Sequence, residues 1–549
     1  MKNKNISRRN LFKYAAGSLP LMGIASHPFN LLLTSIIGGI SHRAHAQMNG
    51  PGSPMNFVHI SMDGGPARWM FDLSLKPNGN DNFMNAPMLI SQFDNFTPGS
   101  IAASYATTSI GNYYLPYIWS QVVPGTSVDR SMSDLAQNML MIRGAELLTD
   151  GHQVNRVKAV QPVAGSPSLH GLVADKSTTP IPAISYGGWA MDPTLGFSSQ
   201  KGLGIVRVEG SNPMPDIMRP FDIGSSGMSF GNIDIAASID NALDIIKMNG
   251  KYSSAKVKSL FNDRYSAKQL IEKGVSALND QFNLTIAKYE LLVQRSLNEH
   301  TFSNIDAQAL MTENSSFFKI DGGNIFIPDA GQDLRSAINS NTSVGYLANT
   351  MALTEILLKE ELSSSITLTL DSLQNLQLQY QGMNQYFSFR NDSHDSGAYS
   401  TLFFYSKYYK AISSCLLELI TVLKNDMHRG YPLFNDSVIH LSSEFGRSAR
   451  FDGTGSDHGW EGTATSVFSG KITQPLIAGN IRYGGTGGNY RGTWGAAGTT
   501  LNNRKINNGN IISSISTLLD ITSPTDNDQS PIRMQNGAAV SNLGDPQNV

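Results

Sequence analysis

The sequence has only one cysteine among its 549 residues, so an intramolecular disulfide is excluded. That cysteine, Cys415, lies in an apolar helical stretch and is expected in the core. Charged residues make up 15% of the chain, and the formal net charge is −2. No uninterrupted apolar run approaches the about 20 residues of a membrane-spanning helix. These absences argue against a disulfide scaffold, against nucleic acid as a partner and against a membrane span after cleavage of the N-terminal segment.

The N-terminal segment, residues 1–46, carries six basic residues and no acidic one. Residues 7–13 read S-R-R-N-L-F-K, which resembles the twin-arginine export signal with its leucine and phenylalanine in swapped order. A moderately apolar region follows, and A-H-A at 44–46 offers a small-x-small cleavage site. We therefore interpret residues 1–46 as a twin-arginine signal peptide. The twin-arginine translocase is then a partner during export, and the periplasm or cell envelope is the destination. The alternative is a cytoplasmic protein with a basic start.

The rest of the chain alternates predicted strands with predicted helices. Strands are expected at 57–62, 139–143, 181–186, 366–370 and 438–441, and helices at 169–174, 346–361, 399–427 and 511–519. This order indicates an α/β fold with a doubly wound, mostly parallel sheet, whose ligand site lies at the carboxyl ends of the strands. We expect a linker at 47–56, one domain at 57–530 with a helical insertion at about 252–300, and a flexible tail at 531–549.

One glycine-rich stretch carries most of the candidate chemistry. Residues 441–460 read L-S-S-E-F-G-R-S-A-R-F-D-G-T-G-S-D-H-G-W and follow the last predicted strand. Asp457 and His458 lie between two glycines, and a carboxylate beside an imidazole suits a divalent cation because both offer ligand atoms. Glu444 and Arg447 are exposed by the same turn. The alternative is a turn in which Asp457 caps the backbone and His458 is merely exposed.

Two further acidic clusters occupy similar positions. Asp63 follows the first predicted strand, and Asp392 and His394 lie in N-D-S-H-D just before the long predicted helix. Taken singly, Asp63 begins a turn and Asp392 caps the helix. Together with Asp457 and His458, they could converge on one or two divalent cations, which would act as a Lewis acid or activate a water molecule. The sequence therefore predicts a metal site.

These residues also carry a family resemblance. The pattern S-E-F-G-R-S-A-R followed by G-S-D-H-G-W resembles the signature E-F-G-R-T-P-R…G-x-D-H of domain-of-unknown-function family 1501, which is similar to the alkaline phosphatase and sulfatase superfamily. Other segments agree in the same order: D-G-G-P after the first strand, His152 in D-G-H, S-P-S-L at 166–169 leading to I-P-A, and D-S-H at 392–394. The resemblance covers most of the chain, from about residue 57 to residue 521.

The resemblance implies an alkaline-phosphatase-like core with its site at the carboxyl edge of the sheet. The residues that match superfamily metal ligands are Asp63, Asp457 and His458 for one metal, and Asp392 and His394 for part of a second set. That second set normally includes a late histidine, but the last histidine of this chain is His458. A two-metal centre would therefore need another ligand, with His152 or Glu444 as the substitute.

The nucleophile is a second departure from the superfamily. In sulfatases it lies two residues before the proline of C/S-x-P-S-R, at a helix start. Gly165 occupies that position here, and Leu169 occupies the place of the arginine. Either Ser166 or Ser168 attacks, or a water activated by the metal attacks directly, or the protein hydrolyses nothing. A serine at this place also has a structural use, because it can cap the following helix.

Two functions fit these residues. The first is an exported metal-dependent hydrolase whose substrate is a small-molecule or glycan ester of phosphate or sulfate. Its cofactor is a divalent metal cation that neutralises the ester oxygens, while Arg447 holds one oxygen; Ser166, Ser168 and Glu444 are further catalytic candidates. For Arg447 the equal alternative is an ion pair with Glu444 or Asp452. The second function is a non-catalytic binding or scaffold protein of the cell envelope that keeps the fold and one structural cation.

Overall fold

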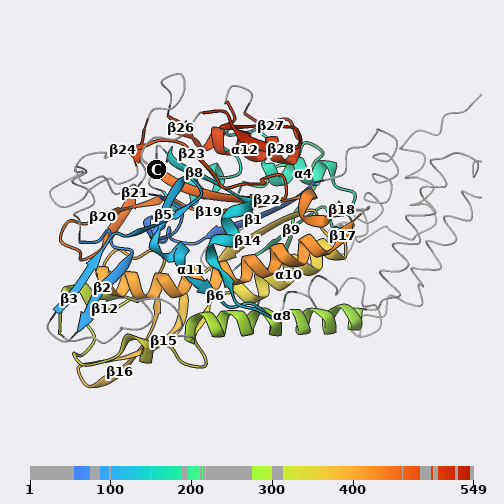
Figure 1. Cartoon of the computed structure of the whole chain (residues 1–549). Coiled ribbons are helices and arrows are strands. Elements are labelled where there is room, and N and C mark those ends of the chain that lie inside the picture. The colour runs from blue at the N-terminus through green and yellow to red at the C-terminus, as the bar shows by residue number, and fades with distance from the viewer. Residues whose placement is uncertain are drawn as a thin grey trace, which may run out of the picture.

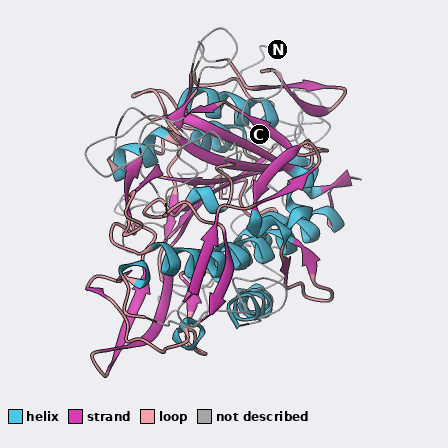
Figure 2. Cartoon of the chain, turned by 60° about the vertical axis from the view of Figure 1, so that its left-hand side comes forward, coloured by secondary structure: helices cyan, strands magenta, loops and turns pink. Residues whose placement is uncertain are grey.

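The computed structural model describes residues 55–74, 87–217, 275–298, 313–428, 431–482, 496–498, 505–525 and 529–543, with short gaps at 98–99, 148, 150, 180, 188–193, 195, 211–212, 214–216 and 460–461. The predicted signal peptide and most of the linker lie outside the described residues, as does the part of the expected helical insertion before residue 275. Figure 1 shows the described elements, and Figure 2 shows them turned by 60° about the vertical axis and coloured by secondary structure.

A nine-stranded sheet forms the centre of the described chain, in the order β10-β9-β14-β1-β19-β22-β8-β23, with β26 also paired to β8. Its strands are β1 (Asn56–Met62), β8 (Met139–Glu146), β9 (Ala183–Tyr186), β10 (Val206–Val208), β14 (Ser365–Leu370), β19 (Ser437–Ser443), β22 (Thr463–Ser469), β23 (Leu476–Ala478) and β26 (Ile506–Asn507). Every pairing is parallel except the two made by β22, which runs antiparallel to both β19 and β8. The predicted α/β class is confirmed, with a mixed sheet.

Alternating side chains of the central strands build two hydrophobic layers, one on each face of the sheet. In β1, Val58, Ile60 and Met62 belong to the larger layer, whereas Phe57 belongs to the smaller one. All four side chains are fully buried. Removing such apolar surface from water contributes about 25 cal/mol per Å², so these layers supply the main driving force for folding.

Helices cover both layers. The larger layer is covered by α10 (Leu347–Lys359) and α11 (Ala398–Asn425), against which α8 (Val275–Asn298) packs, and the smaller layer by α4 (Leu169–Lys176) and α12 (Asn508–Leu519). Figure 1 shows the first group below the sheet and the second group above it, so the sheet lies between two helical layers. None of the helices within the described ranges combines the length and apolar character needed to cross a membrane.

Most elements lie close to where the sequence predicts them. The strands expected at 57–62, 366–370 and 438–441 are β1, β14 and β19, and the long helix expected at 399–427 is α11. The described part of the predicted helical insertion is α8. Long or strongly apolar segments give these clear patterns because their burial dictates their composition.

The glycine-rich stretch that begins at Leu441 differs from the turn expected there. It forms an antiparallel hairpin of β20 (Gly446–Ala449) and β21 (Ser456–Gly459), in which Arg447 pairs with His458. The hairpin leads directly into β22, a central strand that the sequence analysis did not predict. All seven residues of β22 are buried, but its sequence T-A-T-S-V-F-S is mostly small and polar. The usual alternation of apolar and polar residues is therefore absent.

The C-terminal stretch also differs from the prediction of a flexible tail. Within residues 531–549, β27 (Ile532–Gln535) and β28 (Ala538–Ser541) form an antiparallel hairpin that contacts α12. Ile532 and Ala539 are buried in the smaller hydrophobic layer. This hairpin is therefore part of the domain, and residues 544–549 lie outside the described chain.

Candidate metal centre

The candidate residues gather at the carboxyl ends of the parallel strands, where a ligand site is expected. β1 is the direct parallel neighbour of both β14 and β19. Asp63 follows β1 and Glu444 follows β19, so the two carboxyl groups lie at the same edge of the sheet. The helix α3 (His152–Lys158) begins at this edge as well, because β8, which precedes it, runs in the same direction as β19. We call this edge the rim.

Three side chains from distant parts of the chain converge at the rim. His152 opens α3, Asp392 lies between β16 (Met383–Phe389) and α11, and His458 lies in β21. One ligand atom from each lies within 4.8 Å of the other two. The Nε2 atoms of His152 and His458 are 3.7 Å and 3.5 Å from the Asp392 carboxylate. Ligands of one cation lie about 2 to 2.6 Å from it, so this cluster matches a single-cation site in size.

Glu444 holds His152 in position from behind. Nδ1 of His152 is 2.5 Å from Oε2 of Glu444, whose side chain is fully buried. The same oxygen accepts a hydrogen bond from the backbone N–H of Gly64 at 3.2 Å. A carboxylate that binds one ring nitrogen fixes the tautomer and leaves the other nitrogen for a metal. Glu444 is therefore placed to orient a ligand rather than to act as the substitute ligand or as a catalytic group.

Hydrogen bonds between these groups set their protonation. The hydrogen bond to Glu444 raises the pKa of His152. Burial raises the pKa of Glu444, but the hydrogen bonds and charges of His152 and Arg156 together outweigh it, and the pKa is lowered. For Asp392, too, burial is outweighed, because hydrogen bonds from His394 and His458 hold its pKa below the usual range. Both carboxyl groups are thus ionised at neutral pH, which is the form that binds or supports a cation.

Arg447 ties two loops together and does not face solvent. Its side chain is fully buried, and Nη2 donates to the carbonyl of Gly64 and to the carboxylate of Asp392. Its ion-pair partner is thus Asp392 and not Glu444 or Asp452, the two partners considered from the sequence. Gly64 has a φ of 73°, and an added Cβ would lie 2.5 Å from the backbone nitrogen of Asp392. Only glycine therefore allows this approach of the two loops.

His394 and Asp457, two of the predicted ligands, lie beside the cluster rather than in it. Nε2 of His394 is 3.2 Å from Asp392, and Nδ1 is 3.3 Å from Asp457. These two carboxylates raise the pKa of His394 to about 9. Asp457 also accepts a hydrogen bond from Nε of Arg450 at 3.2 Å. Both ring nitrogens of His394 thus face carboxylates, and in this arrangement His394 positions Asp392.

Asp63 lies at the rim but is paired with an arginine that the sequence analysis did not single out. Nη2 of Arg156 donates to Oδ1 of Asp63 at 2.7 Å, and Nε donates to Glu444 at 2.7 Å. Burial, followed by the charge of Glu444, raises the pKa of Asp63 to about 7. The signal that could have found Arg156 is its spacing of four residues from His152, which places both on one helix face.

The two candidate nucleophiles serve the backbone around the start of α4. Ser168 is fully buried and caps the helix, because its hydroxyl oxygen accepts a hydrogen bond from the N–H of Gly171. The hydroxyl of Ser166 donates to the carbonyl of Val163 at 2.7 Å. Within the described contacts, neither serine meets the cluster of His152, Asp392 and His458. This geometry supports the capping interpretation for Ser168.

A second histidine group lies inside the protein, below the rim. His59 of β1, His170 of α4 and His440 of β19 are each at most 4% exposed, and the His59 ring lies 5.3 Å from that of His170 and 5.0 Å from that of His440. We call this group the buried histidine stack. Ser442 is the partner of His59, and Thr465 is the partner of His440, both at 2.7 Å. Burial lowers the pKa of His59 to about 3 and that of the other two well below the usual value.

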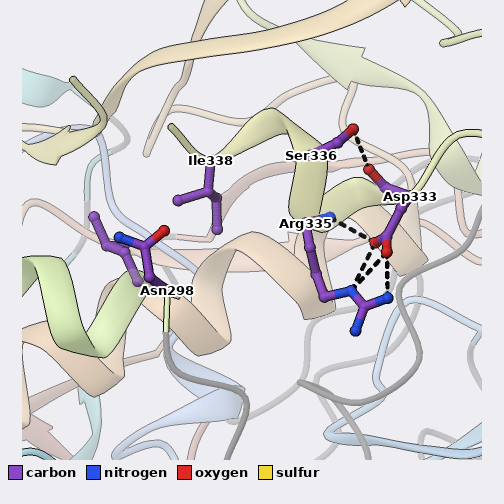
Figure 3. A pocket seen from close by; sticks show the side chains of 6 residues that line it. Asn298, Asp333, Arg335, Ser336 and Ile338 are labelled. Atoms are coloured by element: carbon purple, nitrogen blue, oxygen red, sulfur yellow. Dashed lines mark hydrogen bonds and ion pairs between the residues drawn. The ribbon is translucent and has the colours of Figure 1, made fainter. Parts of the chain in front are cut away.

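A cavity of about 440 Å³ lies elsewhere and contains none of the rim residues. It is lined by Leu297, Asn298, Asp333, Arg335, Ser336 and Ile338, which Figure 3 shows. The two charged side chains in this lining, Asp333 and Arg335, form an ion pair with each other. The cavity therefore offers no group that resembles the chemistry of the rim.

No protein-family model, no curated protein and no solved structure matches this chain. The function of the rim is therefore argued from its own geometry, and the resemblance to family 1501 stays a prediction.

Proposed function

We propose that this protein is an exported metal-dependent hydrolase of phosphate or sulfate esters with an alkaline-phosphatase-like fold. The observation that carries the proposal is the convergence of His152, Asp392 and His458 at the rim. Two imidazoles and one carboxylate form a known ligand set of hydrolytic zinc sites, which keep a further position open for water or substrate. The side chains are 21 to 37% exposed, so a cation and a small ester can reach them.

The proposed roles follow from the contacts. His152 and His458 would hold the cation through Nε2, and Asp392 through a carboxylate oxygen. A bound divalent cation neutralises ester oxygens and lowers the pKa of a water molecule. Glu444 keeps His152 in the tautomer that can bind the cation. Arg447 fixes Asp392 from behind. Because Arg447 is fully buried, it does not hold an ester oxygen in this proposal.

Water is the nucleophile in this proposal, because the hydroxyls of Ser166 and Ser168 are engaged with the backbone around α4. The oxygen of water forms a bond to phosphorus or sulfur, and the bond to the ester oxygen breaks. The alcohol leaves with a proton, and inorganic phosphate or sulfate is the second product. No covalent intermediate with the chain is formed.

A binding or scaffold protein of the cell envelope is the second candidate. The burial of Arg447 favours it, because the sequence offered that side chain as the arginine to hold an ester oxygen. In this case the cation at His152, Asp392 and His458 would join α3, β21 and the loop before α11, and would stabilise the fold by linkage.

Metal content together with hydrolysis of aryl phosphate and aryl sulfate separates these candidates. We expect the wild type to bind a divalent cation and to hydrolyse at least one ester, and Asp392→Asn to lose both properties. Asp452→Asn is the matched control, because Asp452 is exposed and, among the described residues, bonds within its own turn to Thr454. A cation without hydrolysis of either ester would support the scaffold, and a wild type that binds no cation would contradict both candidates.

Export is a separate part of the proposal and rests on residues 1–46 alone. Paired guanidiniums are the feature that the twin-arginine translocase reads. Replacing both Arg8 and Arg9 by lysine should therefore leave uncleaved protein in the cytoplasm, which fractionation and immunoblotting would show. An unchanged periplasmic yield would rule this route out.

A further inference from the structure

We infer that the rim takes one divalent cation per chain and that the guanidinium of Arg156 fills the place of a second cation. The inference rests on the proposed function, because it counts the cations of that same centre. It departs from the two-metal arrangement that the superfamily resemblance implies.

Asp63 and Glu444 are two carboxylates of the rim outside the cluster of His152, Asp392 and His458, and together they could hold a second cation. They follow neighbouring parallel strands directly and are both largely buried, with side chains 18% and 0% exposed. Two buried carboxylates side by side are costly unless a positive charge lies between them. Arg156 supplies that charge, because its Nη2 and Nε atoms lie 2.7 Å from the carboxylates of Asp63 and Glu444. Its own side chain is 6% exposed and thus part of the interior.

The hydrogen bonds of Glu444 leave little room for a metal ion. Oε1 accepts from Arg156, and Oε2 accepts from the backbone of Gly64 and contacts Nδ1 of His152. A cation at Glu444 would have to displace one of these partners. Displacing His152 would remove the bond that orients a ligand of the first cation. The contacts therefore favour one cation on the His152 side and a fixed charge on the other.

One turn of α3 carries both the proposed ligand His152 and the guanidinium of Arg156 to the rim. His152 and Arg156 are four residues apart, which places them on the same face of the helix, and both contact Glu444. An arginine guanidinium supplies positive charge without a bound metal. Asp63 therefore has a positive partner whether or not metal is present, as Asp392 has in Arg447.

The test is the number of cations bound per chain, measured by elemental analysis after equilibration with Mn²⁺ or Zn²⁺ and by calorimetric titration. We expect one equivalent in the wild type and one in Asp63→Asn, because Asp63 is paired with Arg156. In Arg156→Ala the two carboxylates are released, so a second equivalent should appear. The double variant Arg156→Ala/Asp63→Asn should return to one equivalent, and Arg130→Ala, whose arginine pairs with Glu418 elsewhere, should keep one.

Each outcome decides one claim. Two equivalents in the wild type, loss of the single equivalent in Asp63→Asn, or one equivalent in a folded Arg156→Ala would overturn the role of Arg156 and leave the proposed function standing. No equivalent in the wild type, or an equivalent that survives His458→Ala, would instead overturn the proposed centre. If Arg156→Ala does not fold, the wild type and Asp63→Asn still decide the count.

Discussion

Two histidine groups lie near the central strands β1 and β19, one inside the protein and one at the edge of the sheet. The rim group consists of His152, His394 and His458, and the buried histidine stack consists of His59, His170 and His440. β1 carries His59 four residues before Asp63, and β19 carries His440 four residues before Glu444. The same strands therefore lead from one group to the other, from the interior to the edge of the sheet.

The hydrogen-bond partners of the imidazoles, and not the strands near which they lie, determine their pKa and their role. Carboxylates raise the pKa of His152 and His394. The stack has hydroxyl partners, and Nδ1 of His59 and Nδ1 of His440 have no hydrogen-bond partner among the described residues. Burial without a carboxylate lowers the pKa of these two imidazoles. The comparison teaches that imidazoles with carboxylate partners at the rim can be charged or bind a cation. The buried imidazoles of the stack, which have hydroxyl partners, are neutral and structural.

The largest expected effect is acid unfolding driven by the buried histidine stack. Between pH 6.5 and about 3 the unfolded chain binds protons that the folded stack does not accept, so stability is full above pH 6.5 and is lost as the pH falls. Each imidazole contributes up to about 1.4 kcal/mol per pH unit in this window. Asp63, with its raised pKa of about 7, holds a proton in the folded state and offsets part of the loss. Urea unfolding at several pH values would measure the slope.

Variants of the two groups sharpen this test. His170→Asn removes one imidazole of the stack and should flatten the acid slope by up to about 1.4 kcal/mol per pH unit. His152→Asn is the comparison from the rim; because the pKa of His152 is raised, its imidazole does not contribute to the loss of stability on acidification. Equal slopes in the wild type and His170→Asn would show that the stack does not control acid stability.

The next effect is the link between cation binding and folding. A cation at 100 times its dissociation constant stabilises the folded chain by about 2.7 kcal/mol, provided that it binds only that state. We expect added Mn²⁺ or Zn²⁺ to raise the melting temperature of the wild type, chelator to reverse the change, and His458→Ala to show neither response. A stack variant, His170→Asn, should keep both responses. If only the stack variant lost the response of the melting temperature, the cation would bind in the buried histidine stack and not at the rim.

A smaller effect, on metal affinity, is expected for Glu444, which contacts the proposed ligand His152. Glu444→Gln keeps the shape of the side chain but weakens the carboxylate partner of His152, and loss of such partners lowers metal affinity about 10- to 100-fold. Calorimetric titration would measure the change, and Asp452→Asn again serves as the control. An affinity equal to that of the wild type would mean that Glu444 does not orient His152.

The smallest effect concerns the serines, which test whether the chemistry is confined to the rim. Ser168→Ala removes the N-cap of α4 and should cost about 1 kcal/mol of stability with no loss of hydrolysis. Ser166→Ala should change stability by less than about 0.5 kcal/mol, since Ser166 is only partly buried and its hydroxyl bonds within its own loop. A large fall in hydrolysis by either folded variant would restore a serine as nucleophile.

Sequence patterns predicted the parts of the fold that are long, apolar or followed by a turn. The strands before Asp63 and Glu444 and the helix after Asp392 gave clear signals, and these segments bring the cluster together. β22 was missed because its buried residues are small and polar, so its pairing partners and not its composition make it a strand. The C-terminal hairpin was missed for a similar reason, since it is stabilised by contact with α12.

The candidate site was predicted in its members but not in their roles. Residue type, position beside predicted elements and the family resemblance placed Asp63, Asp457 and His394 among the ligands. Only the three-dimensional contacts show that Arg156, Arg450 and two carboxylates hold them. Ion pairs between residues that are far apart in the sequence leave no spacing pattern that a single sequence could reveal. The buried histidine stack left a weak signal, because alternation places His59 with Phe57 on one face of β1, but the neighbouring strands come from the fold.

The most direct measurement is the anomalous scattering of crystals equilibrated with Mn²⁺ or Zn²⁺. We predict one anomalous peak per chain at the rim, about 2 to 2.4 Å from Nε2 of His152, Nε2 of His458 and an oxygen of Asp392. No peak should lie between Asp63 and Glu444, where Arg156 is expected. An empty rim, or a peak among His59, His170 and His440 instead, would contradict the proposed centre.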